Sequence, residues 1–100
     1  MSQALAANVE VMQVPLLSSG HISVATRQRF ETEGDANPWC HVAGFEYGYF
    51  ISIPSEWEHA VPPVPADLQA LFRWASQCGF AWVRLDSDGE LIAGLPSFSW

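Results

Sequence analysis

The pattern of hydrophobic and polar positions first predicts a strand in residues 9–17. Apolar and polar side chains alternate there with a period close to two, and Val9 and Val11 fall on the same side. Pro15 lacks a backbone N–H, so it weakens the end of this strand. Residues 1–8 precede the pattern and are expected to form a flexible tail.

A short helix is predicted between Ser23 and Gly34. The Ser23 hydroxyl can accept a hydrogen bond from the first helical turn, and glycine suits the backbone just beyond a helix C-terminus. Only Phe30, with help from Val24 and Thr26, gives this helix an inward face. The sequence therefore predicts a weak helix that depends on one aromatic side chain.

The strongest strand pattern spans residues 39–53. Aromatic and β-branched residues take alternate positions in its second half, namely Phe45, Tyr47, Tyr49, Ile51 and Ile53. Fifteen residues are long for one strand, and glycines inside a strand pattern mark bulges or turns. A hairpin or bulge is therefore predicted between Gly44 and Gly48.

A proline-rich loop over residues 54–64 leads into the better of the two helices. Its apolar residues follow helical spacing, at Leu68, Leu71, Phe72, Ala75 and Cys78. Pro65 lies at its first turn, where Asp67 complements the positive end of the helix dipole. Gly79 is expected to end the helix, and Phe80 is placed for the contact that completes a Schellman motif.

Two further strands are predicted at the end of the chain. In residues 80–85, Val83 and Leu85 share one face of an extended segment. The short polar residues and glycine of residues 86–89 favour a tight turn. Residues 90–93 are then expected to return as a partner strand.

The order of elements, β-α-β(β)-α-β-β, predicts an α+β fold. We expect a single mixed, mostly antiparallel sheet of four to five strands, with two helices on one face. A ferredoxin-like arrangement is one version, and the strand order is left open. A length of 100 residues predicts a single domain over residues 1–100.

The net charge of the chain limits the kinds of molecule that it is expected to bind. Eleven Asp and Glu residues face four arginines and no lysine, so the formal net charge is −7. This balance opposes contact with phosphate backbones, so no direct binding of nucleic acid is expected. It favours a basic partner or a solubilising surface. The sequence has neither a signal pattern nor an apolar run long enough to cross a membrane, which predicts a cytoplasmic protein.

Three segments carry a family resemblance: SGHIS at residues 19–23, EYGYFI at 46–51, and WVRLDSDG at 82–89 followed by GLPSFSW at 94–100. Together they resemble a small family of uncharacterised proteins carried on plasmids, integrative elements and prophages of Gram-negative bacteria. The resemblance covers roughly residues 16–100, and the C-terminal block is its most specific part. It implies no catalytic residue. It implies a setting in which small acidic proteins blunt host defence, as anti-restriction and anti-CRISPR proteins do.

His21 is the basis of the enzymatic alternative. It follows Ser18 and Ser19, but residues adjacent in sequence rarely form a catalytic triad, and no nucleophile-elbow motif is present. The sequence therefore favours a non-enzymatic protein without catalytic residues. A small enzyme that uses His21 and nearby acidic turns stays open as an alternative.

No metal or cofactor is expected. Asp86 and Asp88 suggest a calcium loop, but Gly89 follows too soon for that motif. The cysteines and histidines lack the paired spacing of zinc sites. Cys40 and Cys78 are expected to be free, buried thiols, and a disulfide between them stays open because it depends on a distance that the sequence does not give.

The favoured function is binding of a protein partner, which is basic or itself binds nucleic acid. Tryptophan is enriched at interface hot spots, and the proline-rich loop carries one between two carboxylates. The predicted partner-binding residues are Glu56, Trp57, Glu58, His59, Glu46, Tyr47 and Tyr49. The alternative for Trp57 is packing onto the sheet. A self-associating homodimer stays open as a third hypothesis.

Overall fold

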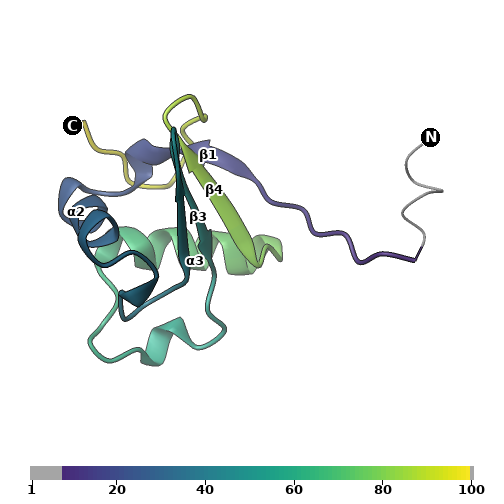
Figure 1. Cartoon of the computed structure of the whole chain (residues 1–100), viewed down its shortest axis with the longest axis horizontal. Coiled ribbons are helices and arrows are strands. Elements are labelled where there is room, and N and C mark those ends of the chain that lie inside the picture. The colour runs from purple at the N-terminus through teal and green to yellow at the C-terminus, as the bar shows by residue number, and fades with distance from the viewer. Residues whose placement is uncertain (1–7, 100) are drawn as a thin grey trace.

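The computed structural model describes residues 8–99, which form a four-stranded mixed sheet and two α-helices (Figure 1). The elements in chain order are β1 (Leu16–Ser18), α2 (Val24–Glu33), β2 (Val42–Phe45), β3 (Gly48–Ser52), α3 (Ala66–Cys78) and β4 (Trp82–Asp86). Short 3-10 turns occur at Ser19–His21, Gly34–Ala36 and Trp57–His59. The α+β fold class predicted from the sequence is confirmed. The tail predicted over residues 1–8 lies, apart from residue 8, outside the described residues.

The strand order is β1-β4-β3-β2, with β1 parallel to β4 and the other pairs antiparallel. A ferredoxin-like sheet is antiparallel throughout, so the order found here is a different one. Strand β4, the last in the chain, is thus an interior strand, and β1 and β2 form the two edges. The predicted hairpin is confirmed, because β2 and β3 pair across a turn at Glu46 and Tyr47.

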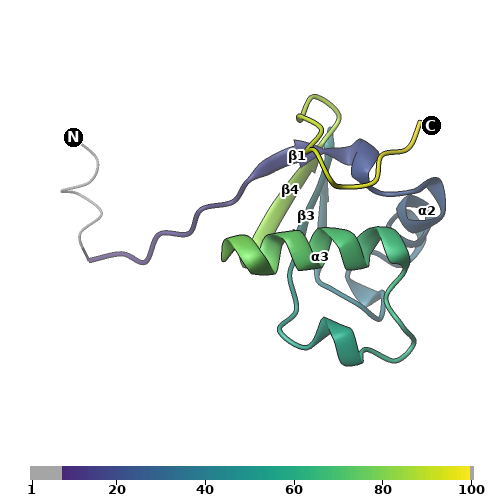
Figure 2. The same cartoon turned by 180° about the vertical axis from the view of Figure 1, so that it is seen from behind.

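The core lies between the helices and one face of the sheet. Alternate residues of β3 and β4 point into it, and each of these four is buried: Tyr49, Ile51, Val83 and Leu85. The helices contribute Phe30 from α2 and Leu68, Leu71, Phe72 and Ala75 from α3. Figure 2 shows α3 running across this face of the sheet. The two helices therefore bury the same face, and no helix within residues 8–99 covers the opposite face.

Helix α2 begins and ends as its sequence predicts. The Ser23 hydroxyl accepts a hydrogen bond from the Thr26 backbone N–H at 3.2 Å, and Gly34 has a φ of 53°. Phe30 is buried and its ring meets the Tyr49 ring edge-on, with centroids 5.4 Å apart. The inward position predicted for Val24 is wrong, because this side chain is exposed. It lies in the first turn, where no element of the sheet covers it.

Helix α3 ends in the predicted Schellman motif. The Phe80 N–H donates to the Ala75 carbonyl at 2.9 Å and the Gly79 N–H donates to the Ser76 carbonyl at 3.2 Å. Gly79 has a φ of 80°, which costs glycine little. The predicted apolar stripe is wrong at its last position, because Cys78 is exposed. The stripe runs past the end of the sheet that it covers.

The predictions for the first and the last strand are wrong in their extent or pairing. Of the predicted residues 9–17, only Leu16 and Leu17 belong to a strand, β1, and the preceding residues extend away from the body as an arm (Figure 1). Residues 90–93 do not pair with β4 as predicted. Instead the Glu90 carbonyl accepts the Ser18 N–H at 2.9 Å. The reason is topological: β1 and β3 already occupy both sides of β4, so the returning chain crosses to β1.

The two cysteines differ in reactivity, which gives a first prediction. Both are free thiols, and burial, with Asp35 nearby, raises the pKa of the Cys40 thiol to about 12. Since the thiolate is the reacting species, a maleimide at mildly alkaline pH should label exposed Cys78 and spare Cys40 in the folded protein. Mass spectrometry of peptides measures both sites. Equal labelling before denaturation would contradict this placement of Cys40.

Candidate functional site

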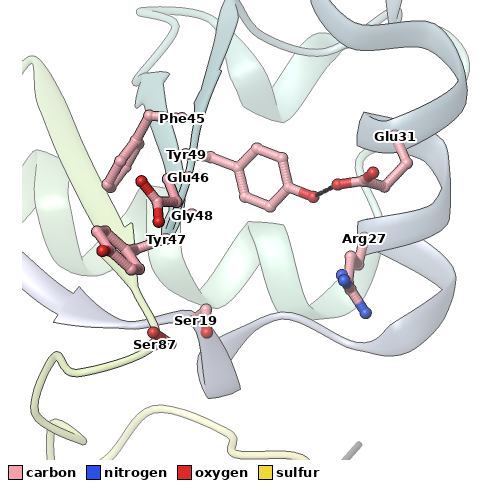
Figure 3. Close-up of a pocket in the computed structure, with 9 residues that line it drawn as sticks. All are labelled: Ser19, Arg27, Glu31, Phe45, Glu46, Tyr47, Gly48, Tyr49 and Ser87. Carbon is pink, nitrogen blue, oxygen red and sulfur yellow. Dashed lines mark hydrogen bonds between the residues drawn. The ribbon is translucent and has the colours of Figure 1, made fainter.

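A cavity of about 220 Å³ opens between α2 and the β2–β3 turn (Figure 3). Three aromatic residues line it: Phe45 at the end of β2, Tyr47 in the turn and Tyr49 in β3. The rings of Phe45 and Tyr47 meet edge-on, with centroids 6.4 Å apart, and Tyr47 is exposed. The serine residues Ser19 and Ser87 complete the lining on its lower side in the view of Figure 3.

The helix side of the cavity carries a paired set of polar groups. The Tyr49 hydroxyl donates a hydrogen bond to the Glu31 carboxylate. Burial raises the pKa of Tyr49, and this hydrogen bond raises it further, while the neighbouring Arg27 guanidinium lowers it. Arg27 and Glu31 are four residues apart on α2, so their side chains lie on the same face of the helix. Their opposite charges largely cancel at this wall.

The turn side of the cavity carries an unpaired carboxylate. Glu46 is exposed, and no side chain or backbone group within residues 8–99 forms a hydrogen bond or ion pair with its carboxylate. The backbone around it is held, because the Ser87 N–H donates to the Tyr47 carbonyl at 3.0 Å. The pairing of Phe45 with Gly48 closes the hairpin next to it. The cavity thus places one free negative charge beside two aromatic rings on a fixed turn.

The aromatic surface continues from the cavity onto the uncovered face of the sheet. The Phe45 and Phe50 ring centroids are 5.3 Å apart, and the Arg84 guanidinium lies 4.9 Å from the centre of the Phe45 ring. One guanidinium nitrogen donates to Asp86 Oδ2 at 2.9 Å, whereas the buried Nε has no hydrogen-bond partner among the described residues. The Asp88 backbone N–H, with Arg84 as a further cause, lowers the pKa of Asp86. We call Phe45, Phe50 and Arg84 the sheet-face cluster.

The predicted partner-binding residues fall into two groups at opposite ends of β3. Glu46, Tyr47 and Tyr49 all line the cavity, although Tyr49 points to the helix side of the sheet. Residues 56–59 lie beyond the other end of β3, in the turn below the sheet in Figure 1. The seven residues therefore do not form one continuous surface.

Trp57 is a core residue. It is 8% exposed, its ring centroid lies 6.1 Å from that of Phe72, and the Arg73 guanidinium lies 5.4 Å from its centre. The alternative of burial is therefore the one found, but the ring contacts of Trp57 are with helix α3 and not with the sheet. Its neighbours Glu58 and His59 are exposed. Any surface role of this turn therefore rests on polar side chains and not on the tryptophan.

His21 ties the C-terminal segment to the body. It is 1% exposed, and both of its ring nitrogens meet backbone groups. The Ile92 N–H donates to Nε2 at 2.9 Å, so the ring proton belongs on Nδ1, which donates to the Pro96 carbonyl at 2.7 Å. The enzymatic alternative needs a nitrogen of His21 that is free to move a proton, and neither is free in this arrangement.

The acidic turn after β4 is organised by its own backbone. Asp86 Oδ1 accepts the Asp88 N–H at 2.8 Å, which is an ordinary Asx-type turn contact. Within residues 8–99, no group of three or more His, Cys, Asp or Glu side chains is placed to hold a metal ion. No helix in this part of the chain is long and apolar enough to cross a membrane.

Sequence reasoning missed Arg27, Glu31 and the sheet-face cluster. The spacing of Arg27 and Glu31 along one helix is a local signal of a pair. Their contact with Tyr49, which is 18 residues beyond Glu31, is not visible in any local pattern. Arg84 and Phe50 become neighbours only through the register of β3 with β4.

A pH prediction arises beside β2, where His41 Nδ1 lies 3.0 Å from Asp35 Oδ1. This hydrogen bond, and next that of the Val42 N–H, lower the pKa of the Asp35 carboxyl below its ordinary 3.8. A lowered folded-state pKa stabilises the fold above the unfolded value, and this contribution is lost as the pH falls through the folded value. Carboxyl chemical shifts from NMR should therefore give a value below 3.8 for Asp35.

The matched test removes one imidazole at a time. His41→Ala should raise the pKa of Asp35 toward the ordinary value, and His59→Ala, at an exposed position of the distant turn, should leave it unchanged. An Asp35 pKa that does not respond to His41→Ala would contradict the contact.

Comparison with known families identifies most of the chain. Residues 14–100 match the model of the C-terminal domain of a family of unknown function, DUF5983, so the chain belongs to this family. No curated protein and no solved structure matches the chain.

Proposed function

We propose that this member of the DUF5983 C-terminal domain family is a non-enzymatic protein-binding domain, which holds a lysine or arginine side chain of a basic partner in the cavity beside Tyr47. The observation that carries the proposal is the unpaired carboxylate of Glu46 next to the rings of Phe45 and Tyr47. Aromatic faces attract cations, and a neighbouring carboxylate adds to that attraction. The formal net charge of −7 would draw a basic partner toward the whole molecule.

Arg27 does not oppose a cationic ligand strongly. It lies on the helix wall of the cavity with Glu31, and the charges of the two side chains offset each other. The remaining charge of the lining is that of Glu46. A cationic side chain that enters on the turn side would meet Glu46 and Tyr47 first.

The sheet-face cluster supplies the rest of the proposed contact surface. Stable interfaces combine a buried apolar centre with a polar rim, and tyrosine and arginine are frequent among their hot spots. Phe45 belongs both to the cavity and to this cluster, so the two surfaces are continuous. A partner whose basic side chain enters the cavity would cover Phe50 and Arg84 with its apolar surface.

The family resemblance supports a setting for this activity. The resemblance implies that proteins with these motifs are carried on plasmids, integrative elements and prophages of Gram-negative bacteria, a setting in which small acidic proteins act on host defence. Proteins that bind nucleic acid present the basic surfaces that the cavity would recognise. We therefore propose an accessory protein that acts in the cytoplasm on such a host protein. The backbone bonds of both His21 nitrogens support the non-enzymatic assignment.

Affinity capture from a Gram-negative bacterial lysate tests this function. The tagged wild type should retain a specific protein that Tyr47→Ala loses and Glu46→Gln holds less tightly, with the difference between Glu46→Gln and wild type shrinking at high salt. Glu58→Gln is the matched control, because it removes one exposed carboxylate at the opposite end of β3. Retention of the same proteins by all four forms, or of none by the wild type, would contradict the proposal.

A further inference from the structure

The arm that precedes β1 has an unusual combination of properties. Residues 9–15 belong to no helix or strand, and at the end of the arm the Pro15 carbonyl accepts a hydrogen bond from the Arg84 N–H at 2.9 Å. Val9, Val11 and Met12 are 64%, 72% and 56% exposed. A solvated segment is ordinarily polar, whereas this one carries β-branched residues at alternate positions with unpaired backbone groups. The arm therefore has the composition of a β-strand but does not pair with the sheet.

Strand β2 is an edge strand that pairs only with β3 among the described strands, and the 3-10 turn Gly34–Ala36 contacts it. The Ser52 N–H donates to the His41 carbonyl at 3.0 Å, which makes these two residues a hydrogen-bonded pair. Antiparallel pairs alternate, so Val42 and Gly44 direct their backbone groups away from β3. Asp35 Oδ1 accepts a hydrogen bond from the Val42 N–H at 3.1 Å. The Gly44 N–H, the Gly44 carbonyl and the Val42 carbonyl have no partner among residues 8–99.

The opposite edge of the sheet is closed. The Ser18 N–H of β1 donates to the Glu90 carbonyl, and Leu17 bridges to Glu90, so the C-terminal segment lies along its outer side. The arm leaves the sheet from β1, and both views show it running away from the body (Figures 1 and 2). The arm and the free edge of β2 therefore belong to opposite sides of the sheet, and pairing between them requires two molecules.

We propose that residues 9–14 of one copy add as a strand to β2 of a second copy. The occupant of the β2 edge is thus a second copy of this chain. The arm offers six residues to the four of β2, which is enough to pair the three free groups of Gly44 and Val42 once the arm is extended along the edge. Reciprocal exchange by both arms would close a two-fold dimer and cover the exposed valines.

The charges permit this contact in spite of the net charge of −7. Strand β2 carries no charged side chain, and Glu10 is the only charged residue among residues 9–14. The two segments that would meet therefore carry one carboxylate between them, that of Glu10. This inference does not depend on the proposed partner, because it rests on the backbone groups of Val42 and Gly44. Phe45, the last residue of β2, is the one position of this strand that also belongs to the cavity and the sheet-face cluster.

Sedimentation velocity over a range of concentrations tests the dimer. The wild type should move from the monomer mass of 11.1 kDa toward twice that value as its concentration rises. The double variant Val9→Asp, Val11→Asp should stay monomeric, because it places charges on the pairing segment. Val61→Asp is the matched control: Val61 is the most exposed valine, at 89%, and lies in a loop. It should behave as the wild type does.

A second variant tests the other side of the contact. Gly44→Pro removes the outward N–H that the added strand would bond, while β3 makes no use of that group. It should also abolish the rise in mass, and a far-UV spectrum equal to that of the wild type confirms its fold. In the wild type, amide exchange at Gly44 should slow as concentration rises. A monomer at every concentration would overturn the proposal, and so would a dimer that both variants leave intact.

Discussion

Gly48→Ala is expected to destabilise the protein by about 3 kcal/mol or more, because the added methyl group has no room. An ideal Cβ at Gly48 would lie 1.8 Å from the Leu85 carbonyl oxygen, which is backbone of the adjacent strand. A side chain could rotate away, but Leu85 is held in β4 by its pairing with Tyr49. Relief therefore requires the two interior strands, β3 and β4, to separate at the end where Gly48 pairs with Asp86.

Gly44→Ala is the matched control for this result. Its Cβ would find only the Tyr49 ring carbons, at 3.9 and 4.0 Å, which is ordinary contact. Replacing a strand glycine by alanine also reduces the entropy of the unfolded chain, so a gain of about 0.5 kcal/mol is expected. Urea unfolding curves measure both free energies of unfolding. Equal values for the two variants would show that the close approach of β4 to Gly48 is wrong.

His21→Ala is expected to cost about 3 kcal/mol and to free the C-terminal segment. The substitution leaves a hole at a side chain that is 1% exposed, and large-to-small changes in a core cost about 2–5 kcal/mol. It also leaves the Ile92 N–H and the Pro96 carbonyl without their partner, at about 1–3 kcal/mol for each group that stays buried. Water that reaches the released segment reduces this second cost.

Hydrogen exchange and urea unfolding together measure the role of His21. The amide of Ile92 should exchange faster in His21→Ala, and the unfolding midpoint should fall. His59→Ala, at an exposed position, should change the free energy of unfolding by no more than about 0.5 kcal/mol. A His21→Ala protein that keeps wild-type stability and Ile92 protection would contradict the structural role and return attention to the catalytic alternative.

Features of the fold that depend on neighbouring residues could be predicted from the sequence. The cap at Ser23 and the Schellman ending at Gly79 require only a few residues that are close in the chain, and both are confirmed. How far each helix extends beyond the sheet does not depend on nearby residues alone. The sequence therefore predicts inward positions for Val24 and Cys78, whereas both are exposed in the structure. Asp67 illustrates the same limit. It was expected to act on its own helix, yet its carboxylate accepts the Ser23 N–H of α2 at 2.8 Å.

The sheet order could not be predicted because it is set by competition between distant strands. Residues 90–93 have the turn and spacing of a hairpin strand, but β1 occupies the place beside β4 that they would need. The sequence also does not show which of the aromatic residues Trp57 and Tyr47 is buried and which is exposed. Both are aromatic residues among acidic neighbours, and only the folded chain separates buried Trp57 from exposed Tyr47. The sequence therefore identified three of the nine residues that line the cavity, and it did not indicate which of the seven predicted surface residues would lie there.

The central claim, that the cavity beside Tyr47 holds a cationic side chain, is tested most directly by an NMR titration. The probes are blocked single amino acids: N-acetyl-arginine methylamide, N-acetyl-lysine methylamide and, as the neutral control, N-acetyl-norleucine methylamide. At millimolar concentrations both cationic probes should shift the amide signals of Glu46, Tyr47 and Ser87, and Glu46→Gln should weaken this binding by about two- to fivefold. Equal shifts with the neutral probe, or none at these residues with either cation, would contradict the account.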